Sequence, residues 1–149
     1  MYIPIDNNLD FLAGSKINNF RPFEPFNPIL CEFLQDLSLD LMKKTEVKKY
    51  PDILAFAFWC RKANINKIKK IFEDGLFRLG IGLVFHITPS NVPVNFAFSY
   101  VFGLLSGNAN IVRAPSKIFP QVNLICKTID KTLCKKKYSE IRSMTAFVR

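Results

Sequence analysis

The chain has 149 residues, a length that fits one domain with a substantial hydrophobic core. Hydrophobic residues make up 49% of it and 15 residues are Phe, yet no run of about 18 uncharged apolar residues occurs. The sequence therefore predicts no membrane span. Its first residues lack the basic start and apolar centre of a secretory signal, so we expect a cytoplasmic protein.

The formal net charge is +9 at pH 7, which raises the question of nucleic-acid binding. The basic residues are spread over residues 43–49, 67–70 and 127–137, a distribution typical of solvated helix faces. The chain also lacks a platform of alternating aromatic and basic residues on which bases could stack. We therefore expect no nucleic-acid partner.

The four cysteines, Cys31, Cys60, Cys126 and Cys134, lie within apolar or helical patterns. No C-x-x-C pair occurs, and the single histidine cannot complete a zinc site. The pattern predicts buried free thiols and no metal site. Cys60 precedes the cations Arg61 and Lys62, which could lower its pKa, but no base accompanies it, so it is not expected to be a nucleophile.

The first part of the chain divides into an arm and a helical region. Residues 1–25 are rich in Asn, Pro and Phe and show no sustained period, so we expect an irregular arm. In residues 27–42 the apolar positions recur at steps of three and four, which predicts an amphipathic helix. Ile53–Cys60 reads as an apolar turn or short helix, and Asn64–Phe72 as a second amphipathic helix. These elements define a helical region at residues 26–78.

From residue 79 onward, apolar runs and helical patterns alternate, which predicts an α/β domain with parallel strands and covering helices. The expected strands are 80–87, 109–113 and 141–148, and the expected helices are 92–106 and 119–134. Because the last predicted strand has no helix after it, residues 79–149 read as the first part of a truncated domain.

Polar turns follow the first two of these strands. The first strand stops at Thr88-Pro89-Ser90-Asn91, and the second stops at Arg113, before Pro115-Ser116. Since ligands of open α/β sheets bind at the carboxyl edge, backbone N–H groups near Thr88 could meet a pyrophosphate there. Arg113 and Lys117 could hold a ribose phosphate, or they could be two ordinary exposed cations. The chain has no G-x-G-x-x-G, which argues against an ordinary dinucleotide turn.

Two side chains near the first turn have two readings each. Asn91 could stabilise an oxyanion through its amide, or it could cap the helix expected from Val92. His86 is better explained as an inward-facing, hydrogen-bonded histidine than as a base. We expect the aromatic residues around Trp59 to pack in the hydrophobic core and not to line a ligand-binding site.

Three segments carry a family resemblance: Tyr50–Asn64, Phe85–Pro93 and Met144–Arg149. The residues Ile87–Pro93, Leu104–Asn108 and Asn110–Arg113 resemble the first nucleotide-binding segment of the aldehyde dehydrogenase superfamily. More closely, the chain resembles the N-terminal part of the LuxC-type long-chain acyl-CoA reductases. This resemblance runs over most of residues 20–149 and covers about the first third of a typical member.

The resemblance implies a nucleotide-binding domain and an NADPH-dependent reduction of a fatty acyl thioester to a fatty aldehyde through a cysteine acyl-enzyme. Asn91 would be the oxyanion donor, and the cofactor would be lined by Ile87, Thr88, Pro89, Ser90, Arg113, Ser116 and Lys117. Related NAD-preferring enzymes carry a glutamate where Ser116 and Lys117 stand. A cation there should accept a 2′-phosphate, so the resemblance predicts NADPH over NADH.

None of the four cysteines corresponds to the family's catalytic cysteine, so we expect an inactive N-terminal fragment of such an enzyme. The implied partners are fatty acyl-CoA or an acyl-protein thioester, acyl-protein synthetase and acyl-transferase subunits, and further copies in a homo-oligomer. Enzymes of this type serve bioluminescence, and relatives occur elsewhere. The alternative is a non-catalytic basic interaction module or nucleotide-binding remnant that meets a partner through its Phe-rich surface.

Overall fold

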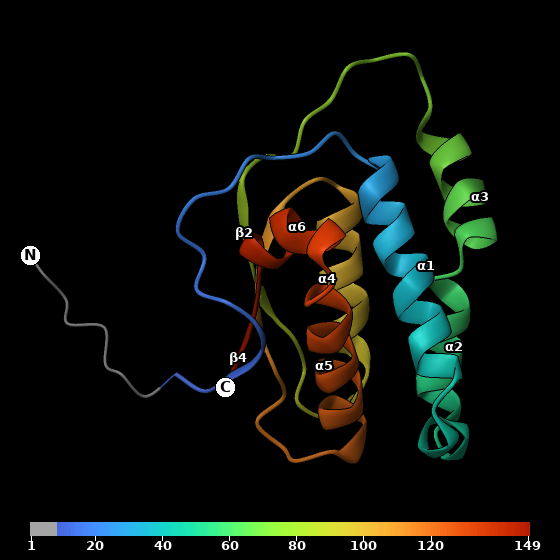
Figure 1. Ribbon diagram of the computed structural model, residues 1–149, viewed down its shortest axis with the longest axis vertical. Helices are drawn as coiled ribbons and strands as arrows, with labels where there is room; N and C mark the ends of the chain where they lie inside the picture. The colour runs from blue at the N-terminus through green and yellow to red at the C-terminus, as the bar shows by residue number, and fades with distance from the viewer. Residues whose placement is uncertain (1–8) are drawn as a thin grey trace, which may run out of the picture.

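The computed structural model describes residues 9–149, in which two successive layers of helices stack on one face of a four-stranded sheet (Figure 1). The strands are β1 (Phe11–Gly14), β2 (Leu83–Ile87), β3 (Ala109–Arg113) and β4 (Thr145–Val148). The helices are α1 (Pro28–Met42), α2 (Pro51–Trp59), α3 (Lys62–Phe72), α4 (Asn95–Leu105), α5 (Pro120–Leu133) and α6 (Ser139–Ser143), with 3₁₀ turns at Thr45–Lys49 and Lys136–Tyr138. The mixed α/β class is confirmed. Residues 1–8 of the predicted arm lie outside the described residues.

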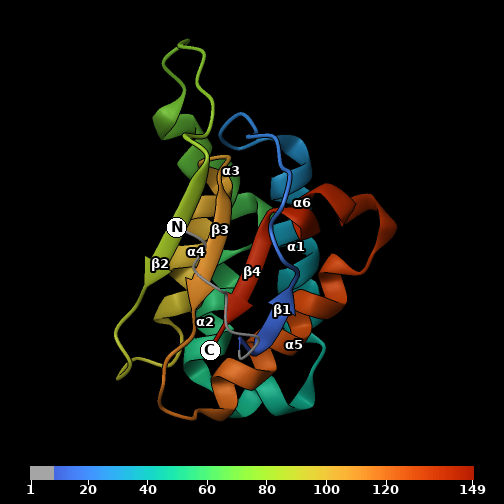
Figure 2. The ribbon, with the colours of Figure 1, turned by 90° about the vertical axis from the view of Figure 1, so that its left-hand side faces the viewer.

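The sheet is mixed and not purely parallel as predicted. Its order is β1-β4-β3-β2; β2, β3 and β4 run parallel, and β1 pairs antiparallel with β4 (Figure 2). Phe11 pairs with Val148 and Gly14 with Ala146, with a shift of register between Phe11 and Ala13. An antiparallel edge strand on an otherwise parallel sheet is common in α/β folds. Part of the predicted arm is therefore a strand.

Two element boundaries differ from the expectation for local reasons. Helix α4 begins at Asn95 and not near Val92, because Val92 precedes Pro93 and a residue before proline avoids the helical region. The third predicted strand is half helix: α6 ends at Ser143, and only Thr145–Val148 is extended. Strand β3 has the predicted bounds.

Helix α1 is the centre of the outer helical layer, which α4 and α5 separate from the sheet. The Asn27 side chain caps it by accepting a hydrogen bond from the Ile29 N–H at 3.1 Å, and Pro28 occupies the first turn, where its missing N–H costs nothing. Its inner face is fully buried: Leu30, Phe33, Leu34, Leu37 and Leu41. It packs against α2 and α5, so the helical layers and the sheet share one hydrophobic core.

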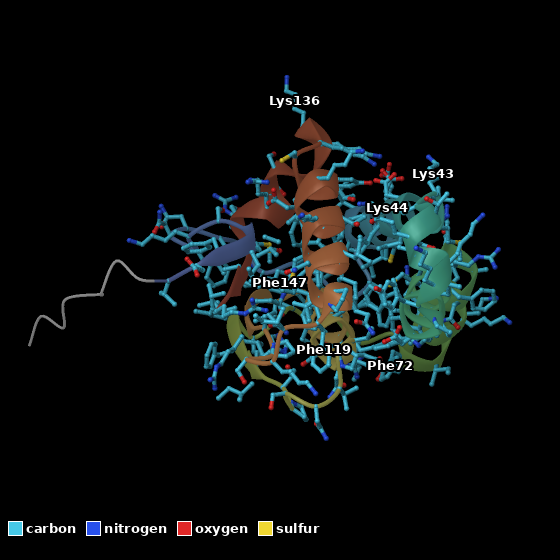
Figure 3. All side chains as sticks on the ribbon, turned by 90° about the horizontal axis from the view of Figure 1, so that it is seen from below. Lys43, Lys44, Phe72, Phe119, Lys136 and Phe147 are labelled. Carbon is cyan, nitrogen blue, oxygen red and sulfur yellow. The ribbon has the colours of Figure 1, made fainter. Side chains whose placement is uncertain are left out.

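The helix-facing side of the sheet is filled by aromatic side chains. Phe147 of β4 is fully buried and meets the rings of Phe96 and Tyr100 of α4 edge-on, at centroid distances of 5.9 and 4.8 Å. Seen from below, Phe147 lies inside the molecule, whereas Lys43 and Lys136 point outward (Figure 3). Lys43 follows the end of α1 and Lys136 follows α5, and both extend into solvent.

Candidate functional site

The carboxyl ends of three strands meet at one edge of the sheet. Ile87 at the end of β2 pairs with Arg113 at the end of β3, and Arg113 pairs with Val148 at the end of β4. The turns that follow β2 and β3, residues 88–91 and 114–117, are therefore neighbours, as predicted. We call this region the carboxyl edge.

The turn after β2 holds a polar atom without a partner. The hydroxyl oxygen Oγ1 of Thr88 is buried and makes no hydrogen bond within the described residues. A buried hydroxyl normally finds a partner, and leaving it without one costs about 1–3 kcal/mol. Ile87, Ser90 and Asn91 around it are exposed. These neighbours are thus open to solvent, whereas the Thr88 hydroxyl oxygen is covered by surrounding protein atoms.

The N-terminus of α4 lies just beyond this turn and has no side-chain cap. The N-cap residue is Val94, and no side chain accepts from the first N–H groups. Asn91 lies four residues before the first helical residue, so the expectation that it caps the helix is wrong. Free N–H groups and the helix dipole favour an anion at this end of α4.

The turn after β3 presents two of the predicted cations. The Ala114 N–H donates to the Val148 carbonyl at 2.9 Å, which fixes the turn against β4. Arg113 and Lys117 are both exposed, and Nζ of Lys117 lies 5.2 Å from the centroid of the Phe119 ring.

A third cation, Arg149, lies at the same edge and was not among the predicted site residues. Its guanidinium donates to the Pro115 carbonyl at 3.5 Å. The signal that could have revealed it is topological, because a third parallel strand must end at the same edge as the first two. Ser116 is exposed beside these cations, and no carboxylate occurs in residues 87–91 or 113–118.

A buried polar network lies beneath the first turn. The Asn110 amide nitrogen donates to the Asn108 carbonyl at 2.7 Å, so the Asn110 Oδ1 faces His86 and accepts from its Nε2 at 2.9 Å. The other ring nitrogen, Nδ1, then accepts from the Ser99 hydroxyl at 2.7 Å. A Cβ on Gly103 would come within 2.0 Å of Asn110 Oδ1, so only glycine at this position lets α4 pack this closely against Asn110 of β3. The predicted inward-facing histidine is confirmed.

The cysteines do not supply a nucleophile at the carboxyl edge. Cys31, Cys60 and Cys126 are buried free thiols, and burial raises the pKa of all three, that of Cys126 to about 12. The prediction of burial is wrong for Cys134, which is exposed and accepts a hydrogen bond from Nη1 of Arg142 at 3.1 Å. It lies just past the far end of α5, about 20 Å from the carboxyl edge at 1.5 Å per residue.

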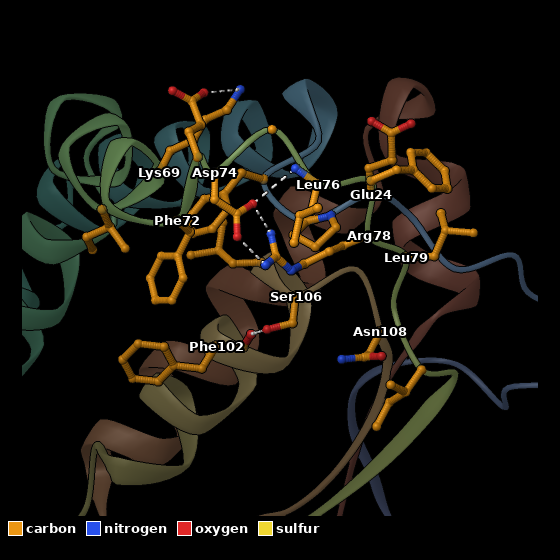
Figure 4. A pocket seen from close by; sticks show the side chains of 18 residues that line it. Glu24, Lys69, Phe72, Asp74, Leu76, Arg78, Leu79, Phe102, Ser106 and Asn108 are labelled. Atoms are coloured by element: carbon orange, nitrogen blue, oxygen red, sulfur yellow. Dashed lines mark hydrogen bonds and ion pairs between the residues drawn. The ribbon is translucent and has the colours of Figure 1, made fainter.

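A groove of about 1010 Å³ lies at the opposite end of the sheet. Its walls include Ile81 and Asn108, which precede β2 and β3, and Phe102 of α4 (Figure 4). The Arg78 guanidinium donates twice to the Asp74 carboxylate in the segment above it, which holds the pKa of that carboxyl well below its usual range. The groove is therefore separate from the predicted cofactor residues.

A family model described as acyl-CoA reductase (LuxC) matches residues 63–146, more than half of the chain. The chain belongs to the LuxC acyl-CoA reductase family. The predicted family resemblance is thereby confirmed. The matched range includes both carboxyl-edge turns and all of Phe85–Pro93, whereas most of Tyr50–Asn64 precedes it. No curated protein and no solved structure matches the chain.

Membership of the LuxC family relates the chain to reductases of acyl thioesters. Across residues 9–149, none of the helices is long and apolar enough to cross a membrane. Within the same residues, no three side chains of the His, Cys, Asp and Glu types gather as metal ligands.

Proposed function

We propose that this LuxC-family chain carries the first nucleotide-binding segment of an NADPH-dependent reductase that converts long-chain fatty acyl-CoA to fatty aldehyde. In this proposal the sheet is part of an aldehyde-dehydrogenase-like domain. The main support for this proposal is the set of groups found at the carboxyl edge. There, a buried hydroxyl and an uncapped helix N-terminus stand without partners beside three cations.

The residues at this edge fit a phosphorylated nucleotide. The Thr88 side chain would turn outward so that its Oγ1 donates to an oxygen of the ligand, and the N–H groups at the start of α4 would face a phosphate. Ile87, Pro89 and Ser90 would form the wall of the site in the same turn. Arg113 and Lys117, with Ser116 between them, would receive the 2′-phosphate of NADPH, because no carboxylate in either turn repels it.

The reduced nicotinamide supplies the hydride when it is bound. Asn91 is exposed and is not used as a helix cap, so its amide is free to donate to the carbonyl oxygen of a thioester. The acyl-carrying cysteine would lie outside these 149 residues, because the exposed thiol is at the wrong end of α5 and the other three are buried. The chain alone would therefore bind NADPH without reducing a thioester.

In the whole enzyme, the substrate would be fatty acyl-CoA or an acyl-protein thioester, and the setting would be the cytoplasm. Acyl-protein synthetase and acyl-transferase subunits would supply the acyl group. These partners follow from the family resemblance and remain part of the proposal.

The test is calorimetric titration of the 149-residue chain with NADPH and with NADH. We expect saturable binding that is tighter for NADPH. The double variant Arg113→Glu/Lys117→Glu should weaken NADPH by about tenfold or more, equivalent to about 1.4 kcal/mol, and NADH by less. The matched control is Lys43→Glu/Lys136→Glu, which makes the same change of charge on the outward-pointing lysines that follow α1 and α5. Equal losses of affinity for NADPH and NADH would contradict the proposed contact with the 2′-phosphate.

The second candidate is an interaction module that binds no nucleotide. It is favoured by the number of exposed phenylalanines, namely Phe11, Phe58, Phe72, Phe77, Phe85 and Phe102. A flat titration with both nucleotides would support this candidate over the reductase segment.

A further inference from the structure

One end of the molecule is formed by α3 and the segment that follows it. In Figures 1 and 2 the segment between α3 and β2 protrudes beyond the rest of the fold at one end of the long axis. We call α3 together with residues 73–79 the α3 tip. Four of its large hydrophobic side chains are 63–79% exposed: Ile71, Phe72, Leu76 and Phe77. Such a concentration marks an interaction surface.

The same part of the chain is strongly basic. Residues 61–79 carry six cations and two carboxylates, so they supply a net charge of +4 to a chain whose total is +9. Lys67 and Lys70 stand two and five residues after the buried Ile65, which places them on the outer side of α3, and both are exposed. The α3 tip therefore joins the outward-facing lysines of an amphipathic helix to an exposed apolar loop, a combination typical of helices that lie on membrane surfaces.

The two carboxylates of the α3 tip are already paired within it. The Arg78 guanidinium donates twice to Asp74, and Nζ of Lys69 lies 3.8 Å from Oε1 of Glu73 (Figure 4). Asp74 also accepts from the Leu76 N–H at 3.1 Å, which stabilises the turn of the loop. Four cations of the α3 tip and the residue before it form no ion pair within residues 9–149: Arg61, Lys62, Lys67 and Lys70. The charge left uncompensated is therefore positive.

Exposed apolar side chains beside uncompensated cations fit the surface of a bilayer that contains anionic lipids. Apolar side chains enter the boundary between headgroups and acyl chains, whereas lysines stay at the level of the phosphates. A nucleic acid would use the cations alone and leave the apolar loop in water. The α3 tip includes neither edge of the sheet nor its open face, so it leaves both free for the rest of a larger domain.

We propose that the α3 tip docks this chain on the surface of membranes that contain anionic phospholipids. Ile71, Leu76 and Phe77 enter the headgroup region, and Lys67 and Lys70 bind lipid phosphates. The total charge of +9 adds attraction at longer range, up to about the Debye length. This inference goes beyond the proposed function and does not depend on it.

The first measurement is co-sedimentation of the 149-residue chain with sucrose-loaded vesicles. We expect binding to vesicles of phosphatidylcholine and phosphatidylglycerol in equal parts, and at least about tenfold weaker binding to phosphatidylcholine alone, since each basic residue near an anionic surface contributes about fivefold. Lys67→Glu/Lys70→Glu should weaken binding to the mixed vesicles by about tenfold or more. Lys43→Glu/Lys136→Glu makes the same change of charge elsewhere and should weaken it much less. Equal losses from the two variants would overturn the proposal.

The apolar part of the contact has its own pair of variants. Leu76→Ser/Phe77→Ser leaves the charge unchanged and should weaken binding to the mixed vesicles by about tenfold or more, because two apolar side chains no longer leave water. Leu39→Ser/Ile118→Ser, at exposed apolar side chains outside the α3 tip, is the matched control and should bind as the wild type does. Unchanged binding of the first variant would contradict insertion of the loop.

Fluorescence quenching measures whether the loop enters the bilayer. Trp59 is the single tryptophan of the chain, so Trp59→Phe removes the native signal and Phe77→Trp then places one reporter in the α3 tip. Mixed vesicles with brominated acyl chains should quench this reporter, whereas a reporter introduced by Leu39→Trp on α1 should stay unquenched. No binding of the wild type to mixed vesicles, or binding without quenching of the loop reporter, as expected for adsorption through charge alone, would each overturn the proposal.

Discussion

The two faces of the sheet differ sharply, although the same strand supplies side chains to both. In β2, Val84 and His86 point toward the helices, while Phe85 is 56% and Ile87 is 70% exposed. The inner face is densely packed, with Phe147 and Tyr100 fully buried. Phe85 and Ile87 therefore contribute little to the hydrophobic core of these 149 residues. The inner face of the sheet stabilises the fold, whereas the outer face leaves its apolar side chains exposed.

The largest expected effect comes from truncating the inner face. Phe147→Ala would leave a cavity beside Phe96 and Tyr100 and should lower the free energy of unfolding by about 3–5 kcal/mol. Phe85→Ala on the open face should cost less than about 1 kcal/mol, because this side chain is already largely exposed. Urea denaturation of both variants measures the difference. Similar losses would mean that the open face also contributes to the stability of the monomer.

A smaller effect is expected from the polar network between β2, β3 and α4. His86→Leu should cost about 1–3 kcal/mol, because Asn110 Oδ1 and the Ser99 hydroxyl would lose their buried partner. The double variant His86→Leu/Asn110→Leu should cost less than the sum of the two single variants, since both members of one pair are then removed. Strict additivity in urea denaturation would contradict a coupled network.

The smallest effect concerns the ion pairs of the outer helical layer. Burial raises the pKa of Asp36, but hydrogen bonds from Tyr138, Lys137 and Lys135 outweigh it, and the net pKa lies below its usual value of 3.8. A lowered folded-state pKa stabilises the protein above about pH 4, and this contribution is lost as the pH falls through the folded-state value.

Asp36→Asn should therefore lower the free energy of unfolding near neutral pH by less than about 1 kcal/mol, and the difference from wild type should shrink below about pH 4. Unfolding curves across this pH range provide the measurement. Glu46→Gln, at an exposed carboxylate of the same layer, is the control and should leave the pH profile unchanged. A difference that grows in acid would contradict the sign of the shift.

Periodicity predicted the regular elements well and the edge strand poorly. Helix α1 and strand β3 follow from their repeating apolar positions and their Pro and Gly boundaries. The four residues of β1 show no usable alternation, because a register shift interrupts them and their partner lies near the other end of the chain. The short helix Ser139–Ser143 is hard to predict because Ile141 is its one apolar residue and it directly precedes the mainly apolar segment Met144–Val148.

The carboxyl edge could be predicted because parallel strands end together, which places Thr88 and Arg113 at one edge from the sequence alone. The contribution of Arg149 could not be read from spacing, since it depends on β4 lying next to β3. The missing partner of the Thr88 hydroxyl is also invisible in a sequence, because it depends on what packs around a single atom. Asn91 remains a predicted oxyanion donor.

The pairing of β1 with β4 has a consequence for biosynthesis. Phe11 is made 137 residues before its partner Val148, an interval on the order of ten seconds at about 5–20 residues per second. Until then, β1 has no strand to join, and the Asp130 carboxylate that accepts from the Gly14 N–H at 3.0 Å has only just been made. The helices α1 to α3 can form meanwhile from local contacts, whereas β1 can join the sheet only after β4 has been made.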